Sequence, residues 1–467
     1  MPKIEVNEEL FFSLVGEKYG YDILEERLTS GKAELDEKPD VSLPQGERSI
    51  KIELNDTNRP DLWSTAGIAR QLRLHSGGKT PDYSAFLSSK EKTRDYGSRT
   101  VTVDPELKNI RPFMTAFVIS GKPIDEPMLL DIIQTQEKLC WNFGRKRRSV
   151  SMGVYRSANI TWPVHYTAVD PDKTSFVPLQ SEERMTCREI LTRHPKGKEY
   201  GWILRDAEKF PLLKDDRNEV MSMAPIINSA TLGAVQVGDS NLLVEMTGTD
   251  MPSLLLATNI VACDFADAGY EILPVRIDHP YDTGFGNSIV TPFYFQEPAQ
   301  ASLEAINRLL GSELSAGEAE EALKRMGCSV AVTGGSLTVT PPPYRNDFLH
   351  AVDVIEDVMI GQGIAAFSSL KPRDFTVGRL TVCTEFSRRA KELMIGLGYQ
   401  EMIFNYLGSG RDFITKMNID GRDVIEIANP MTENYQFLRP SIIPSLLGAE
   451  AVSGNALYPH RIFEIGK

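Results

Sequence analysis

The N-terminal residues alternate between helix-like and strand-like hydrophobic patterns. Asn7, a residue type that caps helix starts, precedes apolar positions with helical spacing, and Gly16 follows them. A second short helix is predicted around residues 23–28. Residues 49–54 alternate as a strand, and residues 62–74 return to the helical period. These elements predict one α+β unit, followed by a polar linker over residues 76–98.

The central part of the chain mixes short strands with helices. The pattern predicts strands at residues 113–119 and 241–246 and a helix over residues 125–139. A mixture of this kind, extending from about residue 100 to 274, favours an α+β domain of its own.

A smaller unit follows, with clearer boundary signals. Residues 303–310 carry one apolar stripe, and Gly311 ends it. Ser315 and Glu318 have the spacing of a capping box for a second helix. The run T-G-G-S then separates two short apolar segments as a hairpin turn does, and P-P-P-Y-R-N leads into a last helix. Two helices, a hairpin and a helix predict a winged-helix-like module.

The C-terminal residues predict a domain that the chain leaves incomplete. A helix after Pro372 places an apolar stripe on a face that we expect to be buried, made of Phe386, Ala390, Leu393, Met394 and Leu397. The last residues, F-E-I-G-K, read as a strand, so we expect a truncated C-terminus. The predicted domains are therefore residues 1–90, 91–274, 275–365 and 366–467.

Composition agrees with several folded domains in a chain of 467 residues, 41% hydrophobic and 25% charged. No apolar run is long enough for a membrane span and no signal peptide is evident, so we expect a cytoplasmic protein without a membrane partner. The net charge of −13 repels nucleic acid unless basic residues gather locally. Arg145–Arg148 is the densest such cluster, either an RNA contact or a solvated face.

Four acidic residues gather around the predicted last helix of the third domain. Asp353, Glu356 and Asp357 follow one another at helical spacing and share a face, and Asp347 lies six residues before them. Oxygen-only ligands suit Mg²⁺. The alternative is that acids in a first helical turn simply complement the helix dipole.

The run R-N-D-x5-D-x2-E-D resembles the metal-bearing signature of the phenylalanyl-tRNA synthetase beta subunit family, of the archaeal and eukaryotic type. The resemblance implies a structural Mg²⁺ site close to an alpha subunit, and it assigns the metal to Asp347, Asp353, Glu356 and Asp357.

A second stretch, F-P-L-L-K-D-D-R-N-E-V-M-S-M-A-P-I-I-N-S-A-T with L-L-V-E-M-T-G-T-D, resembles the editing domain of the same family. The resemblance assigns the editing pocket to Leu213, Ser222, Glu245 and Thr247, with Asn228 as a further candidate. Glu245 would accept a hydrogen bond from the tyrosine hydroxyl. Ser222 and Thr247 would orient the ester or a water, and Leu213 would contact the ring.

A separate site is needed because an apolar pocket excludes an added hydroxyl by only about a hundredfold. A buried carboxylate can instead select for that hydroxyl. On spacing alone, Glu245 and Thr247 also fit solvated positions that alternate outward on a strand.

The last domain resembles a class II synthetase core, with Glu385–Leu397 as an interface helix, but lacks the arginine motifs that hold ATP. The resemblance implies a multidomain α+β chain with an incomplete antiparallel class II core. It implies a heterotetramer of two alpha and two beta subunits that binds ATP, phenylalanine and tRNA(Phe). The alpha subunit would charge the tRNA, and this chain would hydrolyse tyrosyl-tRNA(Phe).

Two other function classes stay open. One is a free-standing hydrolase of mischarged tRNA, which would act without a partner. The other is a magnesium-dependent phosphoryl-transfer enzyme that uses the acidic helix, although no glycine-rich phosphate loop accompanies it.

Overall fold

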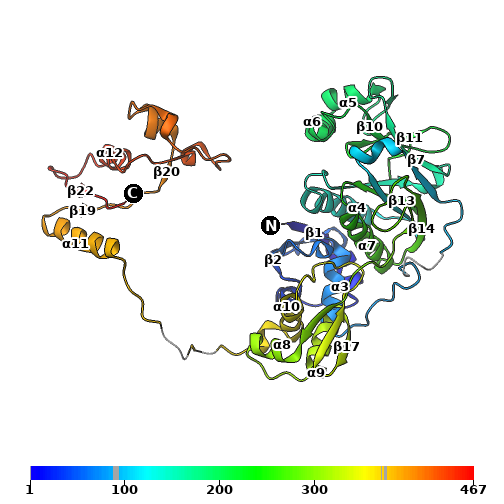
Figure 1. The fold of residues 1–467 in the computed structure, drawn as a ribbon, viewed down its shortest axis with the longest axis horizontal. Coiled ribbons are helices and arrows are strands. Elements are labelled where there is room, and N and C mark those ends of the chain that lie inside the picture. Colours follow the sequence, from blue (N-terminus) through cyan, green and yellow to red (C-terminus); the bar gives the residue numbers. More distant parts are fainter. Residues whose placement is uncertain (1, 88–93, 370, 373–375, 467) are drawn as a thin grey trace. The chain divides into compact units, whose positions relative to one another are not determined.

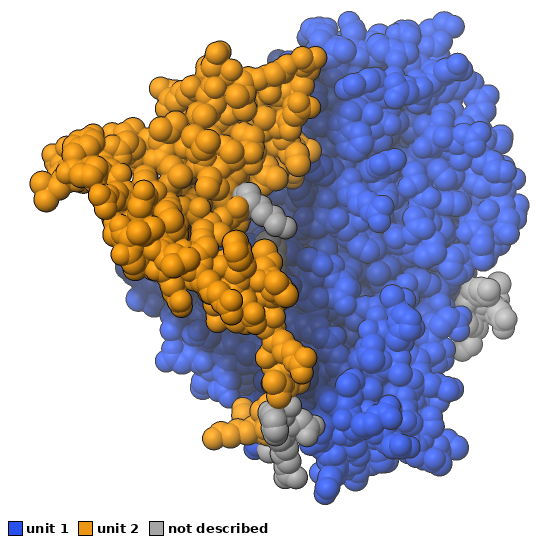
Figure 2. All heavy atoms as spheres, turned by 60° about the vertical axis from the view of Figure 1, so that its left-hand side comes forward, with its two compact units in different colours: residues 1–368 blue, residues 369–467 orange. Residues whose placement is uncertain are grey.

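The computed structural model describes residues 2–87, 94–369, 371–372 and 376–466. The chain divides into two compact units, residues 1–368 and 369–467, which are coloured separately in Figure 2. We call them the first and the second unit and describe each by itself.

The first unit begins with a small antiparallel sheet in the order β1-β3-β2, covered by helices (Figure 1). Its elements are β1 (Lys3–Asn7), α1 (Glu8–Val15), α2 (Tyr21–Leu28), β2 (Ala33–Glu37), β3 (Ser49–Leu54) and α3 (Thr65–His75). The Asn7 side chain accepts a hydrogen bond from the backbone N–H of Leu10, and Gly16 ends α1 with a φ of 84°. The predicted helices and the strand at residues 49–54 are confirmed, whereas β1 and β2 were not predicted.

The polar segment that was predicted as a linker packs in part against the domain. Tyr83, Phe86 and Leu87 are buried. The Tyr83 hydroxyl donates a hydrogen bond of 3.0 Å to Asp267. Residues 88–93 lie outside the described residues. The described part of this segment therefore packs against the domain, because three of its apolar side chains are buried there.

A ten-stranded mixed sheet forms the largest part of the first unit. Nine strands follow the order β12-β11-β10-β7-β4-β14-β5-β13-β6, and β15 pairs with β14. The strands are β4 (Thr100–Val103), β5 (Phe113–Ser120), β6 (Val150–Arg156), β7 (Val164–Val169), β10 (Phe210–Lys214), β11 (Val220–Met223), β12 (Ile227–Asn228), β13 (Asn241–Gly248), β14 (Glu271–Asp278) and β15 (Ser288–Thr291). Neighbours pair antiparallel except β4, which is parallel to both β14 and β7. Strands and helices are mixed here as predicted.

Helices cover this sheet. The longest, α7 (Met251–Asp267), is buried over most of its length and packs against β5, β13 and β14 (Figure 1). α4 (Glu126–Lys138) packs against β6, and the Asp125 side chain caps its start. A smaller layer adds β8 (Ser175–Phe176), β9 (Met185–Thr186), α5 (Cys187–Arg193) and α6 (Pro195–Tyr200). The helices α4 and α7 share one core with the strands, whereas the smaller layer has a separate core.

The last part of the first unit follows the predicted order of two helices, a hairpin and a helix. It contains β16 (Ala299–Ser302), α8 (Leu303–Leu310), α9 (Ala316–Arg325), β17 (Ser329–Thr333), β18 (Ser336–Thr340) and α10 (Ala351–Gln362). The capping box of Ser315 and Glu318 is present at the start of α9. β16 adds a third strand that was not predicted, in the order β16-β18-β17.

The second unit has little core of its own. It contains α11 (Val382–Gly396), β19 (Gln400–Glu401), β20 (Leu407–Gly408), β21 (Phe437–Leu438), α12 (Ile443–Val452) and β22 (Ile462–Phe463). The apolar stripe of α11 was predicted to be buried, and this prediction was wrong. No residue of α11 is buried, and Phe386 and Leu393 are each 71% exposed.

Among the described residues, no helix combines the length and the apolar character needed to cross a membrane.

Candidate functional site

A polar cluster forms where the two ends of the large sheet meet. Tyr155 lies on β6 at one end of the strand order, and Ser222 lies on β11 near the other end. Nevertheless, the Tyr155 hydroxyl lies 2.8 Å from the Ser222 hydroxyl and 3.0 Å from Oε1 of Glu245 on β13. Asn228 on β12 adds a contact of 3.4 Å from its amide nitrogen to the carbonyl of Val154. The sheet therefore curves until its first and last strands share one site.

Strand register explains why these side chains share a face. Leu213 pairs with Ser222, and Ser222 pairs with Asn228. Glu245 pairs with Gly153 on the other side of the site. Directly paired residues of antiparallel strands project to the same face of a sheet. Their side chains therefore converge once the sheet curves.

The site requires glycine at position 153. A Cβ atom at this position would lie 2.4 Å from Oε1 of Glu245 and 2.4 Å from the hydroxyl oxygen of Tyr155. Real Cβ atoms do not approach other atoms so closely, so any larger residue must displace one of these polar groups. Gly153 thus provides the space in which Glu245 and Tyr155 meet.

Glu245 has the electrostatic character of a functional carboxylate. It is only 3% exposed, and among the described residues its Oε2 atom has no hydrogen-bond partner. Burial raises the pKa of Glu245 to about 7, against the opposing effects of the hydrogen bond from Tyr155 and the positive charge of Arg111. The carboxylate lines a cavity of about 260 Å³ together with Ser222, Asn228 and Ser151. A buried acceptor oxygen is thus available to a bound ligand.

A buried arginine, Arg111, holds two hydroxyl side chains of the cluster by hydrogen bonds. Arg111 is 1% exposed and donates hydrogen bonds of 2.8 Å to the Thr247 hydroxyl and 2.9 Å to the Ser151 hydroxyl. It also donates 2.9 Å to the carbonyl of Arg148. Thr247 is fully buried and is not among the residues that line the cavity, whereas Ser151 is. Thr247 is therefore placed to act on the cavity through Ser151.

The structure brings most of the predicted pocket residues together. Ser222, Glu245 and Asn228 line the cavity. Thr247 lies buried on the strand of Glu245, and Leu213 lies buried on β10, paired with Ser222. The alternative of solvated strand positions was wrong, because Glu245 is 3% exposed and Thr247 is 0% exposed.

Sequence reasoning missed four residues of this cluster, namely Arg111, Ser151, Gly153 and Tyr155. Three of them follow one another at alternate positions of β6. Small and polar residues at alternate positions of an otherwise apolar strand are a signal that could have identified this face.

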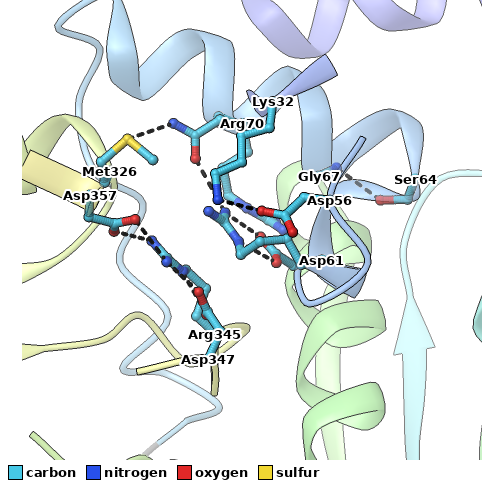
Figure 3. A network of polar contacts seen from close by, with 12 residues as sticks. Lys32, Asp56, Asp61, Ser64, Gly67, Arg70, Met326, Arg345, Asp347 and Asp357 are labelled. Carbon is cyan, nitrogen blue, oxygen red and sulfur yellow. Dashed lines mark hydrogen bonds and ion pairs between the residues drawn. The ribbon is translucent and has the colours of Figure 1, made fainter. Parts of the chain in front are cut away.

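The four acidic residues of the second candidate site contact protein cations and backbone groups, and Figure 3 shows two of them, Asp347 and Asp357, beside Arg345. Arg345 is 2% exposed and lies between two of them. Its guanidinium donates to Asp347 at 3.0 and 2.6 Å and to Asp357 at 2.5 and 3.1 Å. Burial acts to raise the pKa of Asp347, but Arg345 and Arg59 more than offset it and hold this pKa at about 2.

The other two acids have separate partners. Asp353 accepts hydrogen bonds of 2.7 and 2.6 Å from the backbone N–H groups of Leu349 and His350. Glu356 pairs with Lys32 at 2.8 Å, and Lys32 also binds Asp56 at 2.6 Å. The role of Asp353 at the start of α10 agrees with the alternative of a helix-dipole partner.

The four carboxylates do not converge on one point. Across the described part of the chain, no group of three or more His, Cys, Asp or Glu residues is arranged to hold a metal ion. Asp347 and Asp357 pair with Arg345, Glu356 pairs with Lys32, and Asp353 accepts hydrogen bonds from backbone N–H groups, so in this arrangement the four do not surround one Mg²⁺. Mg²⁺ at these residues stays a prediction from the resemblance.

Two family models match the chain. Residues 299–364 match the tRNA synthetase B5 domain, and residues 368–467 match the phenylalanyl-tRNA synthetase beta chain CLM domain. The first range covers β16 to α10, and the second covers nearly all of the second unit.

Close relatives extend over the whole chain. The phenylalanine–tRNA ligase beta subunit of Treponema pallidum is 50% identical, over 100% of this chain and 83% of the relative. That of Borreliella burgdorferi strain ZS7 is 47% identical, over 100% of this chain and 81% of the relative. These relatives are bacterial, so they do not support the expected archaeal and eukaryotic type.

A solved structure is also similar. It is an N-terminal fragment of the phenylalanyl-tRNA synthetase beta subunit from Pyrococcus horikoshii, with a TM-score of 0.70 and 34% identity. The similarity covers 78% of this chain and 100% of the fragment. The multidomain α+β fold is thereby confirmed.

Proposed function

Since the chain belongs to the phenylalanine–tRNA ligase beta subunit family, we propose that it pairs with an alpha subunit to attach phenylalanine to tRNA(Phe) and that it corrects errors of that reaction. The aminoacylation site lies on the alpha subunit. In the assembled ligase, ATP and phenylalanine bind there, and two alpha and two beta chains form a cytoplasmic heterotetramer. The archaeal and eukaryotic type is part of the proposal, supported by the 34% identity to the Pyrococcus fragment.

The corrective activity is hydrolysis of tyrosyl-tRNA(Phe) in the cavity around Glu245. The observation that carries this proposal is the buried carboxylate of Glu245, which lines the cavity and whose Oε2 atom has no partner among the described residues. The phenolic hydroxyl of tyrosine can donate a hydrogen bond to that oxygen. Phenylalanine cannot, and it would leave the buried acceptor unpaired at a cost of about 1–3 kcal/mol or more.

The neighbouring residues take roles that follow from their positions. Ser222 lines the cavity beside Glu245 and would orient the ester or the attacking water. Thr247 would assist through Ser151, with which it shares a contact of 3.0 Å between hydroxyl oxygens. Leu213, buried on β10 opposite Ser222, would support the wall against which the tyrosine ring packs. Hydrolysis adds water to the ester carbonyl, and the ribose oxygen leaves with a proton.

The exposed apolar stripe of α11 supports the pairing with an alpha subunit. Phe386, Leu393 and Leu397 are 63–71% exposed in a unit that has little core of its own. Contiguous exposed apolar residues typically mark a protein interface. A free-standing hydrolase would have no need of such a surface, so the paired ligase is favoured.

The proposal contains no magnesium-dependent step in this chain, because Asp347, Asp353, Glu356 and Asp357 already contact Arg345, Lys32 and backbone N–H groups. A magnesium-dependent phosphoryl-transfer enzyme is disfavoured for the same reason. Isothermal titration of the chain and of an Asp353→Ala, Glu356→Ala double variant decides whether magnesium binds at these acids.

The test of the corrective activity uses the assembled alpha and beta subunits. Glu245→Ala should abolish selective hydrolysis of tyrosyl-tRNA(Phe), while charging of tRNA(Phe) with phenylalanine persists. Glu245→Gln keeps the shape but loses the negative charge, and it should reduce hydrolysis strongly. Unchanged deacylation by the Ala variant would rule out the assignment.

A further inference from the structure

Two larger cavities lead in succession to the cavity around Glu245. One, of about 550 Å³, shares Glu137, Arg147 and Lys196 with it. The other, of about 890 Å³, shares Pro2 and Asn142 with the cavity of about 550 Å³. We call the two larger cavities together the entry groove, because they lead over the surface towards the small cavity.

Basic side chains border the entry groove, together with the acidic side chains of Glu137 and Glu199. Arg147 lines the part next to Glu245, and Arg145 lines the far part. Within the described residues, none of the four basic residues Arg145–Arg148 forms an ion pair with an acidic side chain. In a chain with a net charge of −13, such a cluster is a local site of positive potential.

The backbone of this basic loop has an unusual conformation. Arg145, Lys146 and Arg147 have φ values of 49°, 56° and 68°, so three consecutive residues other than glycine are left-handed. Each such residue costs about 1–2 kcal/mol. The backbone N–H of Lys146 donates 2.8 Å to the carbonyl of Trp141, and that of Arg147 donates 2.8 Å to Cys140. Conformations of this kind gather at functional sites.

Aromatic rings accompany the basic loop. Trp141 lines the entry groove and is 45% exposed, an unusual position for so large an apolar ring. The Lys146 ammonium lies 5.0 Å from the centre of its ring. The guanidinium of Arg147 lies 4.1 Å from the ring of Tyr200, which itself makes an edge contact with Trp141 at 6.5 Å.

Basic and aromatic side chains in one groove are the arrangement that binds single-stranded nucleic acid. Cations attract the phosphates, and exposed rings stack on unpaired bases. A paired helix could not offer its bases to Trp141 in this way. The groove leads to a cavity that, by the proposed function, receives the ester on the terminal nucleotide.

We propose that the entry groove binds the unpaired 3′-terminal nucleotides of mischarged tRNA. Trp141 stacks on one of their bases, and the basic loop Arg145–Arg148 contacts their phosphates. Arg147, which borders both the entry groove and the Glu245 cavity, marks the point where the terminal nucleotide passes from one to the other. This proposal rests on the proposed editing function and adds the route by which its substrate arrives.

The test measures binding to the assembled alpha and beta subunits, with tRNA(Phe) that carries tyrosine through a 3′ amide in place of the ester. This ligand cannot be hydrolysed, so binding is measured apart from catalysis. Trp141→Ala should raise its Kd about tenfold, the effect expected for one lost base stack. The Kd of tRNA(Phe) trimmed of its 3′-terminal nucleotides should stay unchanged.

Trp202→Ala is the matched control, because Trp202 is 43% exposed but lines none of the three cavities. It should change neither Kd. Arg145 lines the far part of the entry groove, so Arg145→Ala should reduce the slope of log Kd against log salt by about one. Trp141 and Arg145 are both exposed, so the variants at these positions should fold.

The outcomes separate this proposal from the editing function. An unchanged Kd of the Trp141→Ala variant for the amide-linked tRNA overturns the entry groove, whatever its rate of hydrolysis. An equal loss for intact and trimmed tRNA also overturns it, because the groove would then bind another part of the tRNA. If the wild type binds the amide through Trp141 but leaves the ester intact, the groove stands and the editing function fails.

Discussion

At the scale of single residues, the raised pKa of Glu245 should make the proposed hydrolysis of tyrosyl-tRNA(Phe) depend on pH. Burial raises this pKa to about 7, so the ionised acceptor is scarce at pH 6 and predominant at pH 8. We expect the ratio of the rates for tyrosyl-tRNA(Phe) and phenylalanyl-tRNA(Phe) to rise about tenfold over this range. Single-turnover hydrolysis of both substrates measures it. Both esters hydrolyse faster in base, and taking the ratio of the two rates removes this shared effect.

Glu245→Gln should remove this pH dependence, and a persistent rise in that variant would contradict the assignment.

The raised pKa of Glu245 also affects the stability of the folded chain. The folded chain holds the Glu245 proton more tightly than the unfolded chain, whose pKa is near 4.5. The contribution to stability is therefore complete below that value and is lost as the pH rises through about 7.

Gly153 offers a second prediction at this scale. In Gly153→Ala, the new methyl group would displace the Glu245 carboxylate or the Tyr155 hydroxyl, since each lies 2.4 Å from its position. A shift of about 1 Å in a catalytic group can slow a reaction about a hundredfold, so we expect a loss of this size in tyrosyl-tRNA(Phe) hydrolysis.

Gly317→Ala is the control for this substitution, because nothing lies within 4 Å of a Cβ at that exposed helical position. It should leave hydrolysis unchanged. If the Gly153→Ala variant were as active as the wild type, the cavity would tolerate a rearranged carboxylate.

The sequence identified candidate residues of the site, but it did not predict which of them contact one another. Ser222 and Glu245 were assigned through a resemblance, and the fold places both at one cavity. Tyr155 was missed because its two partners lie 67 and 90 positions away in the chain. Only the curvature of the sheet brings them within hydrogen-bonding distance, and neither spacing nor periodicity reports curvature.

At the scale of elements, local signals predicted the helices well. Asn7 and the pair Ser315 and Glu318 cap the helices that follow them, because a cap is decided by the few residues around it. The strand β1 was missed because it is only five residues long and pairs with β3, more than forty positions later. The burial of α11 was predicted wrongly because an apolar stripe indicates that a partner is needed but does not say which chain supplies it.

The position of Arg345 predicts a large loss of stability upon its removal. Arg345→Ala would leave Asp347 and Asp357 buried without their cation, which typically costs about 3–5 kcal/mol. Unfolding in urea, followed by a probe in the first unit, measures the change. Because the pKa of Asp347 is held at about 2, its share of this stability is present above its ordinary pKa and is lost as the pH falls towards 2.

Arg193→Ala is the matched control, since Arg193 pairs with Glu183 at the surface and both side chains are about half exposed. A pair of this kind contributes at most about 1 kcal/mol. A loss for Arg345→Ala no larger than that of the control would show that the buried network contributes little.

At the scale of the whole molecule, the second unit is expected to depend on its partner subunit. Phe386→Asp with Leu393→Asp places two charges on the exposed face of α11 and should weaken binding of the alpha subunit by tenfold or more. Co-purification and the affinity between separately prepared subunits measure this. Val237→Asp, at an exposed apolar position in the first unit, is the control and should have no effect. Equal binding of all three proteins would place the interface elsewhere.

The meeting of β6 and β13 with β11 and β12 has a consequence for accuracy under heat stress. Residues far apart in the strand order form the proposed editing cavity, so a slight uncurling of the sheet would disperse it before the domain melts. By the proposed function, aminoacyl-tRNA is made on the alpha subunit, and its synthesis would not depend on that curvature. Cells warmed to the edge of growth would then continue to make protein while tyrosine accumulates at phenylalanine codons.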